Sequence, residues 1–329
     1  AAGFSALKLN STGSYNCAFG GMALDANTTG GFNVAIGFNA LTDSTTADNN
    51  VAIGYNSLDA NTTGELNTAV GASSLGGNTT ASNNTAIGAA ALVSNTTGDS
   101  NTAVGANALD ANTTASHNTA IGRNTLTANT TGTRNVAVGN YALESNTTAD
   151  NNIAIGYEAL EDNTTGTKNT AVGAFALDAN TTADENTAIG YNALTANTTG
   201  TLNTAAGSNA LANNTTANRN SAFGRASLNN NTTGEDNTAV GYYALKDNTT
   251  ASNNCAFGKD TLSANTTGTQ NNGFGVNALT ACTTGNYNVA CGTNTLMSVT
   301  TTSNNTAVGT NALMTNTGSN NTALGYHAL

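Results

Sequence analysis

The tripeptide Asn-Thr-Thr recurs along the chain and invites a chemical interpretation, because Asn-x-Thr is an acceptor pattern for N-linked glycosylation. Its asparagines are Asn27, Asn61, Asn78, Asn95, Asn112, Asn129, Asn146, Asn163, Asn180, Asn197, Asn214, Asn231, Asn248 and Asn265, and Asn10 opens a matching Asn-Ser-Thr. Glycans at these sites would give the molecule a solvated coat. The alternative is a structural Asn/Thr turn ladder. Ser44, Cys282 and Val299 replace the asparagine in other copies, which indicates a cramped and partly buried position.

Other residues that could carry chemistry are few. The two histidines, His117 and His327, are far apart in the sequence, and the acidic residues form no regular column. Neither a catalytic dyad nor a repeated calcium site can be built from them. The cysteine spacing fits no zinc pattern, and we interpret all four as small core residues: Cys17, Cys255, Cys282 and Cys291. We therefore predict no catalytic residue, no metal ligand, no cofactor and no enzyme activity.

The whole sequence is a tandem array with a period of seventeen residues. Asn-x-Ala-x-Gly pentads begin at Asn16 and at every seventeenth residue to Asn305, and the last step, to Asn321, is sixteen. Counted from this asparagine, position 1 is Asn, position 4 is apolar, position 5 is Gly and position 9 is Leu. Position 15 alternates between Ala and Gly, as at Ala47 and Gly64, which indicates a superperiod of 34 residues.

This repeat predicts an all-β fold, a parallel β-solenoid of about nineteen coils. Positions 2 and 4 carry mostly β-forming residues around an alanine, and the run ends at a glycine, which suits a short strand and not a helix. We expect stacking of successive copies to bury the apolar residues at positions 4 and 9. At about 4.8 Å per coil, the array would make a rod roughly 90 Å long.

Stacking also places identical residues above one another. We expect an Asn ladder at position 1, as in stacked cross-β arrays, and a Thr ladder at position 13. Gly at position 5 should either adopt a backbone angle closed to Ala or permit a close approach. Because no linker or composition shift interrupts the repeat, we predict one domain over 1–329. Its ends fall inside a copy, so we expect an uncapped array that continues or abuts other subunits.

Aromatic residues gather at positions 6 and 7, directly after the glycine. We expect them at the surface, where they could stack on sugars or on a partner subunit. The alternative is that they are scattered surface residues that cover a turn. The candidate contacts are Tyr55, Tyr157, Tyr191, Tyr242 and Tyr326.

Composition excludes several function classes. Eight basic and nineteen acidic residues give a net charge of −11, which argues against a nucleic-acid partner. The longest apolar runs are far shorter than a membrane span. Ice binding is a third and less favoured hypothesis, because it needs two outward Thr columns and the column at position 2 is interrupted, for example at Val34 and Val51.

The pentads NVAIG (33–37 and 50–54), NTAVG and NTAIG, followed by small-x-Ala-Leu, resemble the head repeats of trimeric autotransporter adhesins. Similar repeats occur in phage and bacterial tail-fibre proteins. The resemblance covers essentially the whole chain, although the coils here are longer by an inserted NTTG or NTTA segment. It implies a left-handed parallel β-roll, often trimeric, that is displayed outside the cell for adhesion.

We hypothesise a structural subunit or shaft of an extracellular fibre that stacks end to end and carries N-glycans. The alternative is a trimeric adhesin or tail-fibre shaft for surface attachment. In both cases the main partner is a second copy of the chain. Both place the protein outside the cell or on a cell or virion surface, without membrane insertion.

Overall fold

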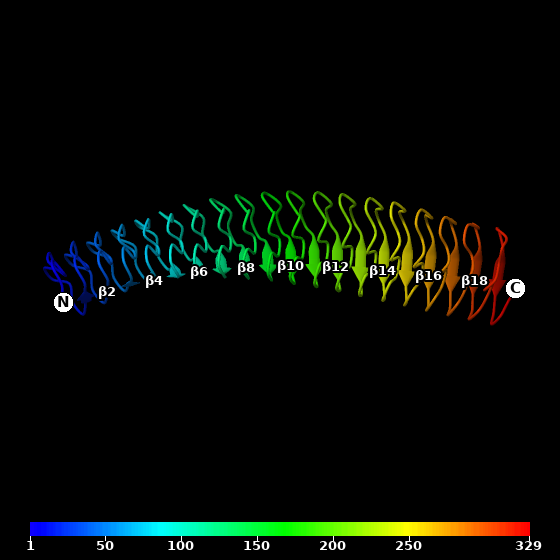
Figure 1. Cartoon of the computed structure of the whole chain (residues 1–329), viewed down its shortest axis with the longest axis horizontal. Coiled ribbons are helices and arrows are strands. Elements are labelled where there is room, and N and C mark those ends of the chain that lie inside the picture. The colour runs from blue at the N-terminus through cyan, green and yellow to red at the C-terminus, as the bar shows by residue number, and fades with distance from the viewer. The chain divides into compact units, whose positions relative to one another are not determined.

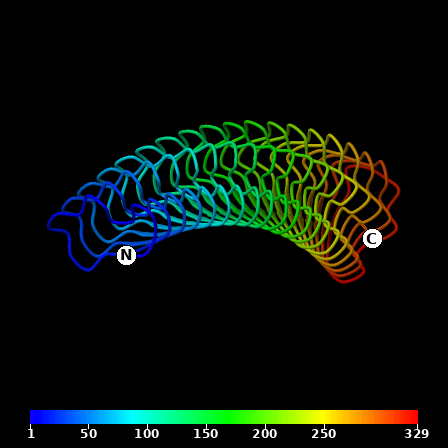
Figure 2. The same ribbon diagram turned by 60° about the vertical axis from the view of Figure 1, so that its left-hand side comes forward.

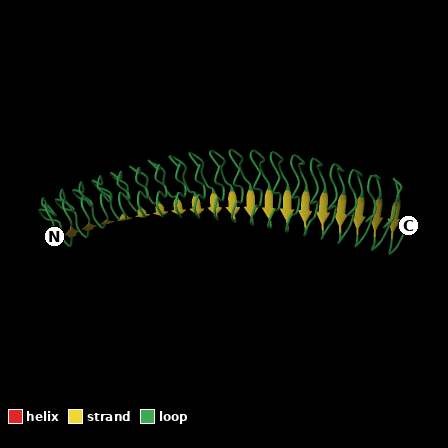
Figure 3. Cartoon of the chain, viewed as in Figure 1, coloured by secondary structure: helices red, strands yellow, loops and turns green.

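The computed structural model describes residues 1–329 and contains strands and turns but no helix. The chain divides into two compact units, Ala1–Thr167 and Lys168–Leu329, which are described separately. Each unit is a parallel β-solenoid in which one coil takes about seventeen residues (Figures 1 and 3). The predicted fold class is therefore confirmed, whereas the single domain over 1–329 stays a prediction.

Each strand has three residues, at positions 2 to 4 of its coil. The first unit contains Cys17–Phe19 (β1), Val34–Ile36 (β2), Val51–Ile53 (β3), Thr68–Val70 (β4), Thr85–Ile87 (β5), Thr102–Val104 (β6), Thr119–Ile121 (β7), Val136–Val138 (β8) and Ile153–Ile155 (β9). The second unit contains Thr170–Val172 (β10), Thr187–Ile189 (β11), Thr204–Ala206 (β12), Ser221–Phe223 (β13), Thr238–Val240 (β14), Cys255–Phe257 (β15), Asn272–Phe274 (β16), Val289–Cys291 (β17), Thr306–Val308 (β18) and Thr322–Leu324 (β19). Within each unit, every strand pairs with the next one along the chain, so the coils stack in sequence order (Figure 2).

The period of the sequence sets the register of each sheet. Ala103 of β6 lies beside Ala120 of β7, seventeen residues on. The single sixteen-residue step keeps the same register, since Thr306 still pairs with Thr322. There the chain is one residue shorter in the turn that precedes Asn321, and the strand is unaffected.

The strand alanines, and not the larger residues beside them, face the interior. Ala103 is fully buried, whereas Ile87 and Ile121 at position 4 are each 40% exposed. Alternate residues of a strand point to opposite sides, so either position 3 or positions 2 and 4 can be inside. The interior of each coil already holds a leucine and two asparagines, which leaves room only for a methyl group. The prediction that position 4 is buried was wrong.

Leu at position 9 is buried as predicted, in a backbone conformation that the sequence did not reveal. Leu109 and Leu126 are fully buried, with φ of 53° and 55°. A bulky residue rarely adopts this left-handed region, which costs on the order of 1–3 kcal/mol. Burial of a leucine side chain contributes about 1.5–3 kcal/mol, so packing offsets the strain and keeps the chain turned inward.

Two buried asparagine columns run through each unit. At position 12, Asn78 Nδ2 donates to Asn61 Oδ1 at 2.9 Å and to the carbonyl of Ala81 at 3.0 Å. At position 1, Asn84 Oδ1 accepts the backbone N–H of Asn101 at 2.8 Å. The predicted Asn ladder exists, but position 1 bonds mainly to backbone, and the amide-to-amide ladder lies at position 12.

The predicted Thr ladder is also present and is a side-chain-to-backbone ladder. Thr79 Oγ1 donates to the carbonyl of Thr96 at 3.1 Å, and Thr96 Oγ1 donates to the carbonyl of Thr113 at 3.0 Å. These threonines are half-buried, whereas the next residue, at position 14, is exposed. The Thr column therefore closes the turn that follows the amide ladder.

Glycine at position 5 satisfies both conditions expected of it. Gly105 has φ of +136°, and a Cβ on it would lie 2.3 Å from the carbonyl oxygen of Gly122 in the next coil. Position 15 differs, because Gly98 has no positive φ, and the limit there is a close approach to the carbonyl of Ala115.

We expect Gly105→Ala to destabilise the first unit by at least about 3 kcal/mol, since left-handed strain and a backbone clash add. Urea unfolding followed by circular dichroism measures the change. Gly76→Ala is the matched control, because Gly76 has no positive φ and other coils carry larger residues at its position. An equal loss of stability in both variants would contradict this account of position 5.

The amide ladder is interrupted where position 12 is not asparagine. Ser44 leaves Asn27 Oδ1 and its own Oγ buried without a hydrogen-bond partner, and Cys282 leaves Asn265 Oδ1 in the same state. A buried polar atom without a partner costs about 1–3 kcal/mol. These two sites are therefore local weak points in otherwise closed ladders.

We expect Ser44→Asn to stabilise the first unit by about 1–2 kcal/mol, because it restores ladder bonds to Asn27 and to Asn61. Cys282→Asn should gain less, because its Oδ1 would face the apolar Val299. The measurement is the free energy of unfolding in urea. The reverse change in an intact ladder, Asn112→Ser, should be destabilising. No difference between Ser44→Asn and the natural chain would refute the ladder as a stabilising element.

Candidate functional site

The outward face of the strands, formed by positions 2 and 4, is the most unusual surface of each unit, and we call it the outward sheet face. Position 4 is apolar in every coil. In the first unit it holds Phe19, Ile36, Ile53, Val70, Ile87, Val104, Ile121, Val138 and Ile155. In the second unit it holds Val172, Ile189, Ala206, Phe223, Val240, Phe257, Phe274, Cys291, Val308 and Leu324.

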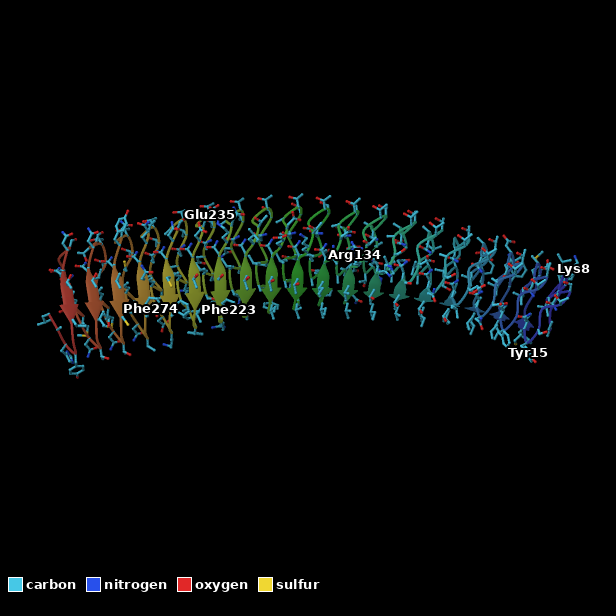
Figure 4. All side chains as sticks on the ribbon, turned by 180° about the vertical axis from the view of Figure 1, so that it is seen from behind. Lys8, Tyr15, Arg134, Phe223, Glu235 and Phe274 are labelled. Carbon is cyan, nitrogen blue, oxygen red and sulfur yellow. The ribbon has the colours of Figure 1, made fainter.

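Neighbouring residues of this column are in contact along the sheet. In the second unit, the rings of Phe257 and Phe274 stack with centroids 5.4 Å apart and planes 10° apart. Phe223 and Phe274 lie on the strand side of that unit, whereas Glu235 lies toward its turns (Figure 4). Position 2 of the coils holds mostly Thr and Val, and most of these side chains are half-buried. The face is thus a regular strip of apolar groups beside hydroxyl and methyl groups.

Exposure of such an apolar strip to water is unfavourable in free energy. Monomeric soluble proteins rarely expose contiguous apolar patches larger than a few hundred Å². Here an apolar side chain recurs at position 4 of every strand. It is half-buried on β4, β6, β8, β10, β12 and β14 and exposed on the other strands, where Ile36, Ile53 and Ile155 are each between 36% and 40% exposed. The arrangement favours burial of the outward sheet face against another apolar surface.

The asparagines of the candidate glycosylation sites lie inside the coils. All fourteen Asn-Thr-Thr asparagines are fully buried, and only Asn10, in the first coil, is half-buried. The amide nitrogen that would carry a sugar donates instead to the adjacent coil and to its own turn, as in Asn112 and Asn146. This burial and bonding match the alternative of a structural turn ladder, and glycosylation at these asparagines stays a prediction.

The candidate aromatic contacts are at the surface. The exposed fractions of Tyr55, Tyr157 and Tyr191 are 57%, 46% and 51%. Some pack on an aromatic residue of the adjacent coil, as Phe38 does on Tyr55 with ring centroids 6.1 Å apart. Tyr242 and Tyr326 are also exposed. Their role as contacts for a ligand or a partner stays a prediction.

Only one cysteine belongs to the core, which corrects the prediction for the others. Cys17 and Cys291 are exposed and Cys255 is half-buried, because they occupy positions 2 and 4 of the outward sheet face. Cys282, at position 12, is buried, and burial raises the pKa of its thiol to about 11. Burial also raises the pKa of Cys255.

No group of side chains suggests a catalytic or metal centre. His117 and His327 are both exposed, and His327 Nε2 lies 3.1 Å from the amide nitrogen of Asn311. Neither unit holds three His, Cys, Asp or Glu side chains close enough to share a metal ion, and neither has a ligand-sized cavity. Neither unit contains a helix of the length and hydrophobicity needed to cross a bilayer.

A cation–aromatic cluster in the second unit was not anticipated from the sequence. Arg225 Nη1 lies 3.2 Å from the hydroxyls of both Tyr242 and Tyr243. Its guanidinium carbon lies 5.7 Å and 5.8 Å from the centroids of their rings. Hydrogen bonds from Tyr242 and Arg225 lower the pKa of Tyr243. The sequence feature that could have predicted this cluster is that Arg225 and Tyr242 occupy position 6 of consecutive coils, seventeen residues apart.

Comparison with known proteins assigns no family. No protein-family model matches the chain, and no curated protein matches it significantly. The resemblance to adhesin head repeats and tail-fibre repeats stays a prediction from the pentads.

We expect the four thiols to react with iodoacetamide in the order of their exposure. At pH 8 and low protein concentration, Cys17 and Cys291 should be labelled first and Cys255 more slowly. Cys282 should be protected until the chain unfolds, because it is buried and its raised pKa keeps it protonated. Mass spectrometry of the labelled peptides gives each rate. Early labelling of Cys282 would contradict the placement of position 12 in the core.

Proposed function

We propose that the protein is a structural shaft of an extracellular fibre or appendage, in which copies of the chain associate laterally through the outward sheet face. It would serve surface attachment, as in the adhesins and tail fibres that its pentads resemble. The protein acts in this proposal through its regular surface and its stability, and not by turning over a substrate.

The observation that carries the proposal is the unbroken apolar column at position 4. Each added coil brings one more exposed or half-buried apolar side chain to the same face, so the area available for association grows with the number of coils. Burial of apolar surface yields about 25 cal/mol per Å². A self-complementary strip of this kind suits a closed symmetric assembly in which every copy uses the same patch.

Lateral association is better supported than the end-to-end stacking favoured by the sequence alone. End-to-end stacking would leave the apolar column in water. Lateral association covers it and uses side chains that contribute little to the interior of the single chain.

Ice binding is less well supported. The outward sheet face presents Thr at position 2 beside Val, Ile or Phe at position 4, so it lacks the second Thr column. The position 2 column itself is interrupted by Val34, Val51, Val136 and Ile153.

Sedimentation velocity of the natural chain tests the proposal. We expect a species of several times the 32.6 kDa chain mass, and threefold mass would match the trimeric relatives suggested by the pentads. Ile53→Asp with Ile121→Asp should shift the chain to monomer with its circular dichroism unchanged, since both side chains face outward and a charge opposes their burial.

Thr63→Asp with Thr131→Asp is the matched control, because these residues are exposed at position 14 and away from the strands. It should assemble like the natural chain. A natural chain that stays monomeric at every concentration would refute lateral association. Long filaments that survive the isoleucine substitutions would favour end-to-end stacking, and thermal hysteresis of a monomer would favour ice binding.

A further inference from the structure

Two consecutive coils of the second unit bring cations and aromatic rings together beside the position 5 glycines. Arg225 and Tyr242 are exposed and Tyr243 is half-buried. The centroids of the two tyrosine rings are 3.9 Å apart, with 38° between their planes. Lys246 Nζ lies 5.4 Å from the centroid of the Tyr243 ring. Arg225, Tyr242, Tyr243 and Lys246 are called the Arg225 cluster below.

Arg225 differs from the other cations of its unit in having no carboxylate partner. Lys168 pairs with Glu185, and Arg219 pairs with both Glu235 and Asp236. Lys246 and Lys259 each pair with the aspartate that follows them in the chain. Four of the five Lys and Arg residues of 168–329 are thus neutralised by ion pairs, and Arg225 is the fifth.

The guanidinium also keeps unused donors. An arginine has five N–H donors, and the hydrogen bonds of Arg225 to the two phenols both come from Nη1. The N–H groups of Nε and Nη2 have no partner in the structure. These two nitrogens form the side of a guanidinium that binds a carboxylate with two parallel hydrogen bonds.

The first unit contains a partial counterpart of this cluster, with one tyrosine in place of two. Arg123 Nη1 lies 3.2 Å from the Tyr141 hydroxyl, and the guanidinium lies 5.9 Å from that ring. Only one tyrosine is present, and Glu144 is close enough for Arg123 to lower its pKa against the stronger effects of burial and Glu158. Arg123 therefore differs from Arg225 in having one tyrosine partner and an acidic residue near enough to interact with its charge.

The two units also differ in net charge, and the second unit, which holds the Arg225 cluster, is the less negative. Residues 1–167 hold three basic and twelve acidic residues, a net charge of −9, whereas residues 168–329 hold five and seven, a net charge of −2. An anionic ligand is repelled less by the second unit. The remaining negative charge disfavours a polyanion as densely charged as nucleic acid and favours a ligand that carries no more than one carboxylate on each sugar ring.

We propose that the Arg225 cluster is a surface binding site for an acidic saccharide, a pyranose that carries a carboxylate. The carboxylate binds Nε and Nη2 of Arg225, and the apolar C–H face of the sugar ring packs on Tyr242. A tyrosine presents an apolar ring and a polar tip, which suits a ligand with both kinds of surface. The cluster lies at positions 6, 7 and 10, outside the strands, so this inference does not depend on lateral association.

Titration calorimetry of the full chain with hexagalacturonate, at millimolar ligand, tests the site. Its methyl ester is the matched ligand, because esterification removes the charge and keeps the sugar. We expect the acid to bind at least about tenfold more tightly than the ester. Arg225→Gln should lower the affinity for the acid by about tenfold, as loss of a charge-assisted hydrogen-bonded pair predicts. Tyr242→Ala should also weaken it severalfold.

Arg219→Gln is the control variant, since Arg219 is also exposed but is held by two carboxylates. It should bind like the natural chain. The proposal is overturned by absence of binding, by equal binding of acid and ester, or by an unchanged affinity in Arg225→Gln. Equal binding of a hexaglutamate peptide, or an unaltered affinity in Tyr242→Ala, would overturn the saccharide assignment. Circular dichroism confirms that each variant is folded.

Discussion

The buried asparagine amide is the interaction on which the rest of each unit depends. An amide at position 12 can be satisfied in the interior only by another amide one coil away and by the turn carbonyl three residues on, as for Asn95. An unpaired buried amide oxygen or nitrogen costs about 1–3 kcal/mol, so nearly every coil presents asparagine at the same height, and Ser44 and Cys282 leave unpaired oxygens where they replace it. That requirement fixes the coil length, the in-register strands and the narrow interior together.

A narrow interior determines which residues face outward. Amides, one leucine and small residues fill each coil, so the strand can contribute only an alanine methyl to the inside. The β-branched and aromatic residues of the strand are then displaced to solvent by the alternation of side chains. The apolar outward sheet face is therefore a direct consequence of a polar core, and it gives a solenoid of modest interior a surface suited to self-association.

Coils differ from one another mainly at the variable positions of the repeat. Positions 6, 7 and 10 lie at turns where the ladders make no demand on side-chain type, so Arg225, Tyr242 and Lys246 can differ from their counterparts in other coils without cost to the stack. The fold thus separates a repeated scaffold, which tolerates little change, from turn residues that can carry local recognition. Three residues that are unremarkable in sequence become one cluster because stacking places consecutive coils beside each other.

The sequence by itself determined the coil length, the parallel stacking, the existence of Asn and Thr ladders, the burial of Leu at position 9 and the surface position of the aromatic residues. Each follows from the period and from the residue types that recur at fixed positions of the coil. Only the tertiary structure decided which face of the strand is inside. Alternation gives the strand two faces, and the bulky apolar residues at position 4 suggest burial of the face that is in fact outside. It also decided that Asn112 and its equivalents are interior amides rather than exposed acceptors, and that Cys17 and Cys291 face solvent. Those outcomes depend on how the turns fold back over the strand, where Leu109 adopts a left-handed backbone, and no local preference of a leucine predicts that conformation.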